Sequence, residues 1–92
     1  MKAYCIDFET YYDKAFSLSK MTTEEYIRSP QFEVIGVSVC EQGGKPQWFS
    51  GTKAATDAWL QGFNFPEHMV IAHNAAFDMA ILSWQFGIRP KA

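Results

Sequence analysis

The order of apolar and polar residues along the chain predicts four strands and three helices. Residues with high strand propensity alternate with others or run continuously in four segments, which we expect to be strands: 3–9, 32–41, 47–50 and 69–72. Capping residues or apolar residues at helical spacing mark three further segments, which we expect to be helices: 21–27, 52–61 and a last one from 75 onward. The resulting order is strand, helix, strand, strand, helix, strand, helix, which indicates an α/β fold.

Local signals define several of these boundaries. Thr22 and Glu25 have the spacing of a capping box, and Pro30 prevents a long continuation of that first helix. The polar turn at residues 42–45 favours a hairpin between the second and third strands, with Pro46 favouring an edge position for the third. The second strand is expected to lie centrally, and residues 64–66 are expected to form a loop.

The same pattern predicts which residues are buried. The strand at 69–72 is a continuous apolar run, so we expect both of its faces to be covered. Cys5 and Cys40 lie in apolar segments without the spacing of a zinc site, so we expect reduced, buried thiols. Trp59 and Trp84 are expected in the core, which leaves Trp48 as the tryptophan to be exposed.

Composition and charge narrow the class of protein. The chain has 92 residues, of which 48% are apolar and 20% charged, as in a single small globular domain. Its net charge of -2, without charge runs, argues against nucleic-acid binding by bulk electrostatics alone. Neither a signal peptide nor a membrane-spanning run is recognisable, so a cytoplasmic protein that does not bind membranes is expected.

Asp7 and Glu9 are the first candidates for chemistry. Residues two apart on a strand project from the same face with Cα atoms about 7 Å apart, so the two carboxylates can converge on one cation. A hard divalent cation such as Mg²⁺ or Mn²⁺ would relieve their repulsion and accept oxygen ligands. The alternative is a solvated, polar strand end.

A second candidate group follows the strand at 69–72. Asn74 fits the N-cap of the last helix, and Asp78 in its first turn is stabilised by the helix dipole, so both have a structural explanation. If the strands at 3–9 and 69–72 are neighbours, however, Asp78 can be a third carboxylate beside Asp7 and Glu9.

Two short motifs carry a resemblance to a known family. The segment Ile6–Thr10 (IDFET) resembles the first motif, Asp-x-Glu, of the DnaQ-like (DEDD) 3′–5′ exonucleases, which have the RNase H-like fold. The segment Asn74–Asp78 (NAAFD) is similar to their second motif, Asn-x-x-Phe-Asp. The resemblance covers the whole chain and is greatest to the proofreading domain of phage-type family A DNA polymerases. It implies an RNase H-like mixed β-sheet with flanking helices.

The resemblance also implies a mechanism and roles for individual residues. In that family, a site of this kind holds two divalent cations, Mg²⁺ or Mn²⁺, which hydrolyse the 3′-terminal phosphodiester of single-stranded DNA. It implies that Asp7, Glu9 and Asp78 are the catalytic metal ligands. It further implies four substrate-binding residues. Phe8 and Thr10 would flank the 3′-terminal nucleotide, and Asn74 and Phe77 would help to position the strand or the helix. The alternative for Phe77 is a place in the core.

The family's third motif, a Tyr or His followed four residues later by Asp, is absent from the chain. His68 and His73 are therefore poor candidates for the general base, and residues 1–92 resemble only the N-terminal half of an exonuclease domain, truncated after the second motif. The isolated chain is then expected to be inactive or weakly active, unless its missing half or another chain completes the sheet. The alternative is a non-catalytic oligomerising or protein-interaction module with an exonuclease-like fold.

Overall fold

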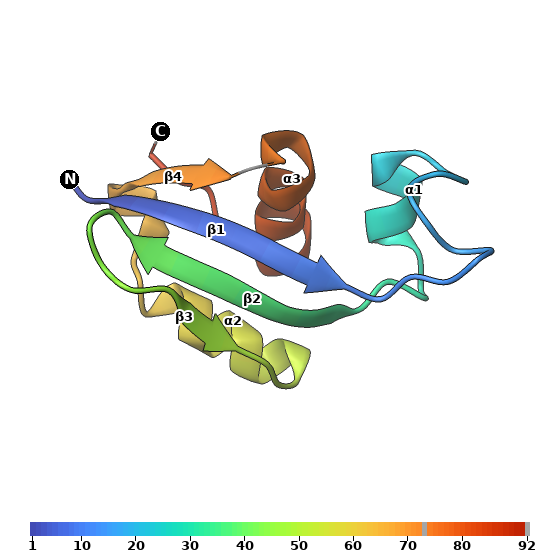
Figure 1. The fold of residues 1–92 in the computed structure, drawn as a ribbon, viewed down its shortest axis with the longest axis horizontal. Helices are drawn as coiled ribbons and strands as arrows, with labels where there is room; N and C mark the ends of the chain where they lie inside the picture. The colour runs from blue at the N-terminus through green and yellow to red at the C-terminus, as the bar shows by residue number, and fades with distance from the viewer. Residues whose placement is uncertain (73, 92) are drawn as a thin grey trace.

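A computed structural model, which describes residues 1–72 and 74–91, has one four-stranded mixed sheet flanked by helices (Figure 1). The strand order is β3-β2-β1-β4. Eight elements follow one another along the chain: β1 (Ala3–Thr10), α1 (Thr23–Arg28), β2 (Val34–Glu41), β3 (Gln47–Phe49), α2 (Lys53–Gln61), the 3₁₀ helix η1 (Phe65–Glu67), β4 (Met69–Ala72) and α3 (Ala75–Phe86). The predicted order of strands and helices is therefore confirmed, and the predicted loop at 64–66 is wrong in part, because η1 begins at Phe65.

The two central strands, β1 and β2, are antiparallel, and β3 returns as the predicted hairpin on the β2 edge. The pairing of β1 with β2 shifts between Glu9 and Thr10, where Ile35 is the extra residue of a β-bulge. The bulge explains why Ile35 is 48% exposed, while Val37 and Val39, which follow it along β2, are buried.

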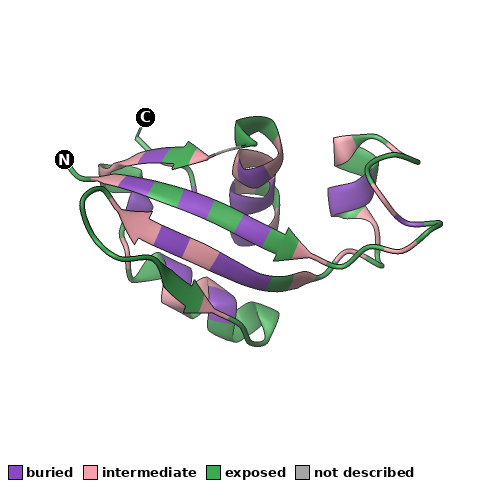
Figure 2. Cartoon of the chain, viewed as in Figure 1, coloured by how far each residue is buried: buried purple, intermediate pink, exposed green. Residues whose placement is uncertain are grey.

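The opposite edge is β4, which runs parallel to β1 and pairs with its first half, from Ala3 to Ile6. Helices α2 and α3 lie behind the sheet in the view of Figure 1, and strand residues alternate between buried and exposed along β1 (Figure 2). One face of the sheet thus packs on the helices. This face of the sheet contributes five side chains to the core: Tyr4, Ile6, Phe8, Val37 and Val39. Helices α2 and α3 contribute four more: Leu60, Ile81, Leu82 and Phe86.

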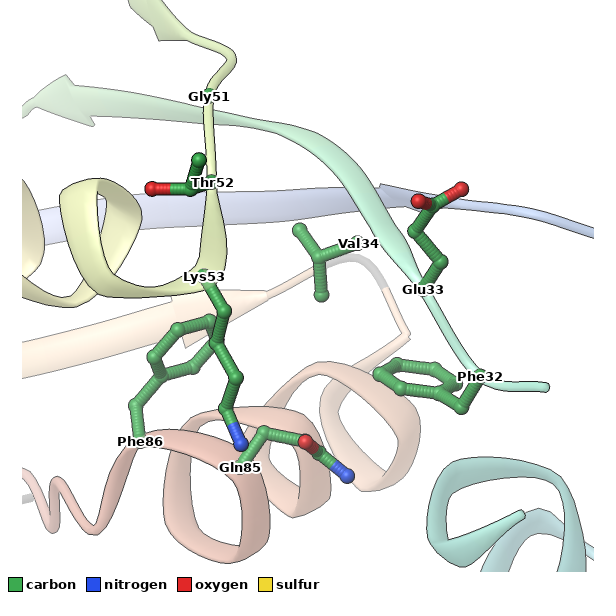
Figure 3. A pocket seen from close by; sticks show the side chains of 8 residues that line it. All are labelled: Phe32, Glu33, Val34, Gly51, Thr52, Lys53, Gln85 and Phe86. Carbon is green, nitrogen blue, oxygen red and sulfur yellow. The ribbon is translucent and has the colours of Figure 1, made fainter. Parts of the chain in front are cut away.

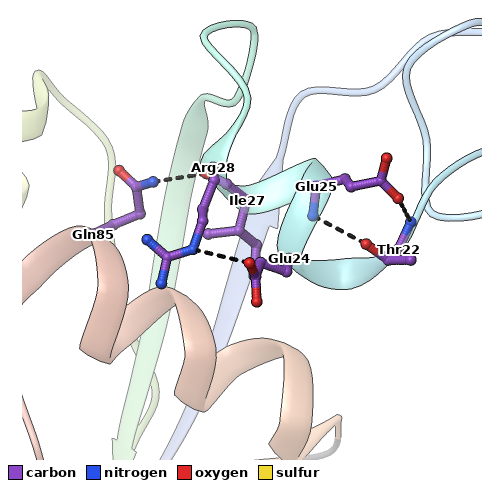
Figure 4. A network of polar contacts seen from close by, with 6 residues as sticks. All are labelled: Thr22, Glu24, Glu25, Ile27, Arg28 and Gln85. Carbon is purple, nitrogen blue, oxygen red and sulfur yellow. Dashed lines mark hydrogen bonds and ion pairs between the residues drawn. The ribbon is translucent and has the colours of Figure 1, made fainter.

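Helix α1 is fixed at both ends. Its predicted capping box is present, because the Thr22 side chain accepts a hydrogen bond from the Glu25 N–H and the Glu25 carboxylate accepts one from the Thr22 N–H (Figure 4). At the other end, Gln85 of α3 donates from Nε2 to the Ile27 carbonyl at 2.7 Å. The short helix is therefore held against α3 next to the C-terminal end of β1.

The face of the sheet that is turned away from α2 and α3, called the open face below, differs from two predictions. Ile71 of β4 is 53% exposed, so this strand is not buried on both faces. Cys5, its neighbour on β1, is a free and exposed thiol, and Cys40 opposite Cys5 is half-buried. The predicted strand at 69–72 is confirmed, but no described helix covers this face, and β4 is an edge strand.

The tryptophans follow the prediction in two cases of three. Trp48 is exposed, and Trp59 is partly buried and stacked on Phe49 with ring centroids 5.1 Å apart. Trp84 is 41% exposed rather than in the core, with the Arg28 guanidinium 4.5 Å from its ring centroid. Helical spacing predicted that Trp84 lies on the buried side of α3. The residues that α3 buries are Asp78, Ile81, Leu82 and Phe86, so Trp84 lies outside the buried face.

Within residues 1–72 and 74–91, no helix has both the length and the apolar character needed to cross a membrane.

Candidate metal centre

Asp7 and Glu9 project from the open face of the sheet, at the end of β1 that extends beyond β4. Both side chains are exposed, and they alternate with the buried Ile6 and Phe8 as predicted. Across the ladder Asp7 lies opposite Ser38 and Glu9 lies opposite Gly36. Two carboxylates therefore share one face on an interior strand, with small residues beside them on β2.

Asp78 approaches the same stretch of β1 from the first turn of α3. Its side chain is only 1% exposed, and its Oδ1 accepts a hydrogen bond from the Phe8 backbone N–H at 3.1 Å. This hydrogen bond connects Asp78 directly to the strand segment 7–9, which is far from it in the sequence. The condition on which a third carboxylate depended, that β1 and β4 be neighbours, is met.

The direction of the backbone groups along β1 explains why the Phe8 N–H points toward Asp78 rather than toward β2. Ala3 accepts from the Gln42 N–H and Tyr11 donates to the Glu33 carbonyl, so odd-numbered residues of β1 bond toward β2. Even-numbered residues point toward β4, where Lys2 accepts from the Met69 N–H. Within the described residues β4 ends at Ala72, opposite Ile6, and beyond that point the Phe8 N–H donates to the Asp78 carboxylate.

Burial raises the pKa of the Asp78 carboxyl above its ordinary value of 3.8. The hydrogen bonds from the backbone N–H groups of Phe8 and Asn74 act in the opposite direction, and the negative charges of Asp7 and Glu9 add to the rise. The two exposed carboxylates therefore act electrostatically on the buried one, and a positive charge between them would relieve the repulsion.

The three carboxylates are neighbours without converging on a common point. Among residues 1–72 and 74–91, no three His, Cys, Asp or Glu side chains are arranged so that they could hold a metal ion. Asp78 is held by its hydrogen bond to β1, whereas the side chains of Asp7 and Glu9 are exposed to solvent. Carboxylate oxygens are the donors that Mg²⁺ and Mn²⁺ prefer, so the donor set fits a hard divalent cation.

A groove adjoins Glu9 at the C-terminal end of β1. It has a volume of about 340 Å³, and its lining includes Phe8, Thr10 and Phe77, three of the four residues predicted to contact the substrate. The exposed side chains of Tyr12 and Leu18 form its outer part. Asn74 is the N-cap residue of α3, as predicted, but its side chain makes no capping hydrogen bond.

Tyr26 is a residue of this region that the sequence did not single out. It is buried, its hydroxyl is 2.9 Å from the Thr10 hydroxyl, and it donates to the Tyr11 carbonyl. Its ring also lies against Phe77, with ring centroids 6.1 Å apart. Tyr26 therefore holds the chain that leaves β1 in place over the groove; its position on the apolar side of α1 was the only signal for it in the sequence.

A second pocket, of about 180 Å³, lies away from the acidic residues (Figure 3). Its lining comes from the start of β2, the start of α2 and the end of α3, and includes Glu33, Lys53 and Gln85. None of the residues predicted to bind substrate or metal lines this pocket.

The histidines do not add to the candidate centre. His68 precedes β4, and its Nδ1 accepts a hydrogen bond from the Lys2 backbone N–H at 3.0 Å, next to the start of β1 rather than its acidic end. His73 lies outside the described residues.

No protein-family model matches the sequence, and no curated protein matches it. The interpretation of the acidic residues therefore depends on their chemistry and geometry.

The stability of the metal-free protein is expected to depend on the ionisation of Asp78. Because the pKa of Asp78 is raised in the folded chain, the fold holds a proton that the unfolded chain has lost, so stability falls as pH rises from about 3.8 through the raised pKa. Asp78→Asn, which removes the charge, is expected to gain stability relative to the wild type between pH 4 and pH 7. Urea unfolding of both proteins across that range in chelator measures this difference.

Two other carboxylates have pKa shifts of the opposite sign. The pKa of Asp13 is lowered by hydrogen bonds from Tyr11 and from backbone N–H groups, and that of Glu25 is lowered by its capping box, so their contributions are lost as pH falls. They are present in both proteins, so the difference between wild type and Asp78→Asn isolates Asp78. Parallel stability curves would contradict the expected role of its charge.

Proposed function

We propose that this chain is part of a metal-dependent 3′–5′ exonuclease with an RNase H-like fold, and that Asp7, Glu9 and Asp78 are its metal ligands. The proposal extends to a proofreading domain of a DNA polymerase, with the 3′ end of single-stranded DNA as substrate. It is carried by one observation: the buried Asp78 carboxylate is bonded to the strand between Asp7 and Glu9. The strand order and the parallel pairing of β1 with β4 are compatible with that fold.

The burial of Asp78 favours a metal-binding role over a purely structural one. A hydrogen-bonding residue for the Phe8 N–H could be neutral, yet the chain uses a carboxylate whose charge is disfavoured by burial and by two neighbouring acids. Buried carboxyls whose pKa is shifted by burial and by neighbouring charges are typical of functional sites. Divalent cations bound here would activate water and stabilise the leaving oxygen of a phosphodiester.

The remaining residues have positioning roles in this proposal. Phe8 and Phe77 supply apolar surface to the groove beside Glu9, and Thr10 supplies a hydroxyl held by Tyr26. Asn74 begins the helix that carries Asp78. The terminal nucleotide would lie in the groove with its phosphate toward the carboxylates.

The proposed site is incomplete within this chain, because the third motif of the family is absent. The open face of the sheet and the edge strand β4 are where a further segment or another chain would pack, and Ile71 and Cys5 are exposed there. The same exposed face also favours the second candidate, a non-catalytic interaction module that binds protein and needs no metal.

A competition experiment with end-containing and end-free DNA tests the proposed function. We expect a linear oligonucleotide to bind in Mn²⁺, and a circularised oligonucleotide of the same sequence to compete poorly, because an exonuclease site recognises a 3′ end. Binding should be lost in chelator and in Asp7→Asn. Any cleavage should release nucleotides from the 3′-labelled end and require the same carboxylate.

Glu67→Gln is the matched control. Glu67 is an exposed acid in η1, before the start of β4 and away from the acidic end of β1, so its loss should leave binding unchanged. Equal competition by circular and linear DNA, or metal-independent binding, would contradict the exonuclease proposal and favour the interaction module.

A further inference from the structure

Trp48 lies on the open face of the sheet in the same row of residues as Asp7. It is opposite Ser38 in the β2–β3 pair, and Ser38 is opposite Asp7 in the β1–β2 pair. The indole is 56% exposed, although tryptophan is among the side chains that gain most from burial. A large exposed aromatic ring therefore stands two strands away from an acidic side chain on one surface.

The Trp48 ring does not extend away from the sheet but covers Gly36. A Cβ atom built on Gly36 would lie 2.2 Å and 2.3 Å from Cζ2 and Cη2 of the indole, so the ring occupies the place of a side chain there. Gly36 is buried as a result, even though it belongs to the open face. The absence of a side chain at Gly36 is what allows the indole to lie against β2.

Gly36 is also the residue directly opposite Glu9. Side chains at opposite positions of an antiparallel pair have Cβ atoms about 4.5–5.5 Å apart, so the six-membered ring of the indole lies beside the Glu9 side chain. The aromatic ring and the acidic end of β1 thus form one continuous surface, built from β3, β2 and β1.

The other two tryptophans have partners. Trp59 is stacked on Phe49, and Trp84 carries the Arg28 guanidinium. Within residues 1–72 and 74–91, neither an aromatic ring nor a cation is stacked on Trp48. Its outer ring face is therefore available to a planar ligand.

We propose that Trp48 stacks on a nucleobase of the DNA strand whose phosphate is bound at the acidic end of β1. This inference rests on the proposed function. The ligand contact is a base rather than a bare phosphate, because Asp7 and Glu9 repel an anion that arrives without a cation. Base and phosphate of one nucleotide are joined by a single sugar, which fits a ring that extends from β3 over Gly36 of β2 and lies beside the Glu9 carboxylate on β1. Base stacking on an aromatic side chain is tolerant of sequence, so no particular base is required.

Binding of an oligothymidylate is compared with that of an oligonucleotide of equal length that has abasic sites in place of its bases, both in Mg²⁺. Trp48→Leu is expected to weaken oligothymidylate binding by about 5- to 150-fold, the range typical of one stacked base. Its affinity for the abasic strand should equal that of the wild type. The matched control, Trp84→Leu, also removes an exposed indole and should change neither affinity.

Two further variants separate stacking from a folding defect. Trp48→Phe keeps a smaller aromatic ring and should recover part of the lost affinity. Gly36→Ala keeps Trp48 but displaces its ring from the strand, and should weaken oligothymidylate binding without weakening abasic binding. Thermal unfolding of each variant verifies that it is folded.

The proposal is overturned if Trp48→Leu binds oligothymidylate as tightly as the wild type, or if it loses affinity equally for the abasic strand. It is also overturned if the chain self-associates and the dimer shields Trp48 from a soluble quencher. Failure of the proposed function gives a different result, because Asp7→Asn and chelator would then leave binding of the abasic strand unchanged.

Discussion

Asp78→Ala is expected to unfold more easily than Asp78→Asn by about 1–3 kcal/mol, the cost of leaving a buried donor without a partner. Asparagine keeps an oxygen at the Oδ1 position that accepts from the Phe8 N–H, whereas alanine removes that acceptor. Both variants remove the charge, so their difference reports the hydrogen bond and the packing of the side chain without a contribution from charge. Urea unfolding at pH 7 in chelator measures it.

A control pair on α2 shows whether the difference is specific to this site. Asp57 is a half-buried helical acid whose Oδ1 accepts from Gln61, and its Ala and Asn variants should differ by less than about 0.5 kcal/mol. Equal stabilities for Asp78→Ala and Asp78→Asn would show that Asp78 does not connect α3 to β1 in solution.

Mn²⁺ is expected to stabilise the wild-type chain against thermal unfolding. A ligand that binds only the folded state adds about 2.7 kcal/mol at a concentration of 100 times its Kd, and for a domain of this size each kcal/mol raises Tm by about 4–8 °C. The gain should be lost in Asp7→Asn, because the cation would have one carboxylate fewer. Differential scanning fluorimetry with increasing Mn²⁺ gives the shift for each variant.

The metal-free state provides the internal comparison. Without cation, Asp7→Asn should be at least as stable as the wild type, because its charge adds to the electrostatic cost of ionising the buried Asp78. A variant that is stable without metal but fails to respond to it separates metal binding from folding. An equal Mn²⁺ response in wild type and Asp7→Asn would contradict the assignment of Asp7, and Glu67→Gln should respond as the wild type does.

Local signals predicted most of the fold, because the features concerned are decided within a few residues. The capping box of Thr22 and Glu25 and the hairpin after β2 depend on neighbours in the sequence. The alternation of Asp7 and Glu9 with Phe8 likewise follows from the two-residue period of a strand. These features are present where the sequence placed them.

The parts that the sequence did not reveal depend on register and on what covers each face. The bulge that exposes Ile35 and the hydrogen bond from the Phe8 N–H to Asp78 follow from how three separate segments align. Ile71 is exposed because, within residues 1–72 and 74–91, the helices lie on the other face of the sheet, and an apolar run in the sequence does not indicate which faces are covered. The contact of Trp48 with Gly36 requires the alignment of β2 with β3.

Paramagnetic broadening by Mn²⁺ in the NMR spectrum of the chain tests the central claim most directly, because it locates a bound cation by residue. We expect sub-stoichiometric Mn²⁺ to broaden the amide resonances around Asp7, Glu9 and Asp78 first, to leave those near Glu67 sharp, and to lose this selectivity in Asp7→Asn. Broadening centred elsewhere, or a pattern that Asp7→Asn does not change, would contradict a metal site formed by these three carboxylates.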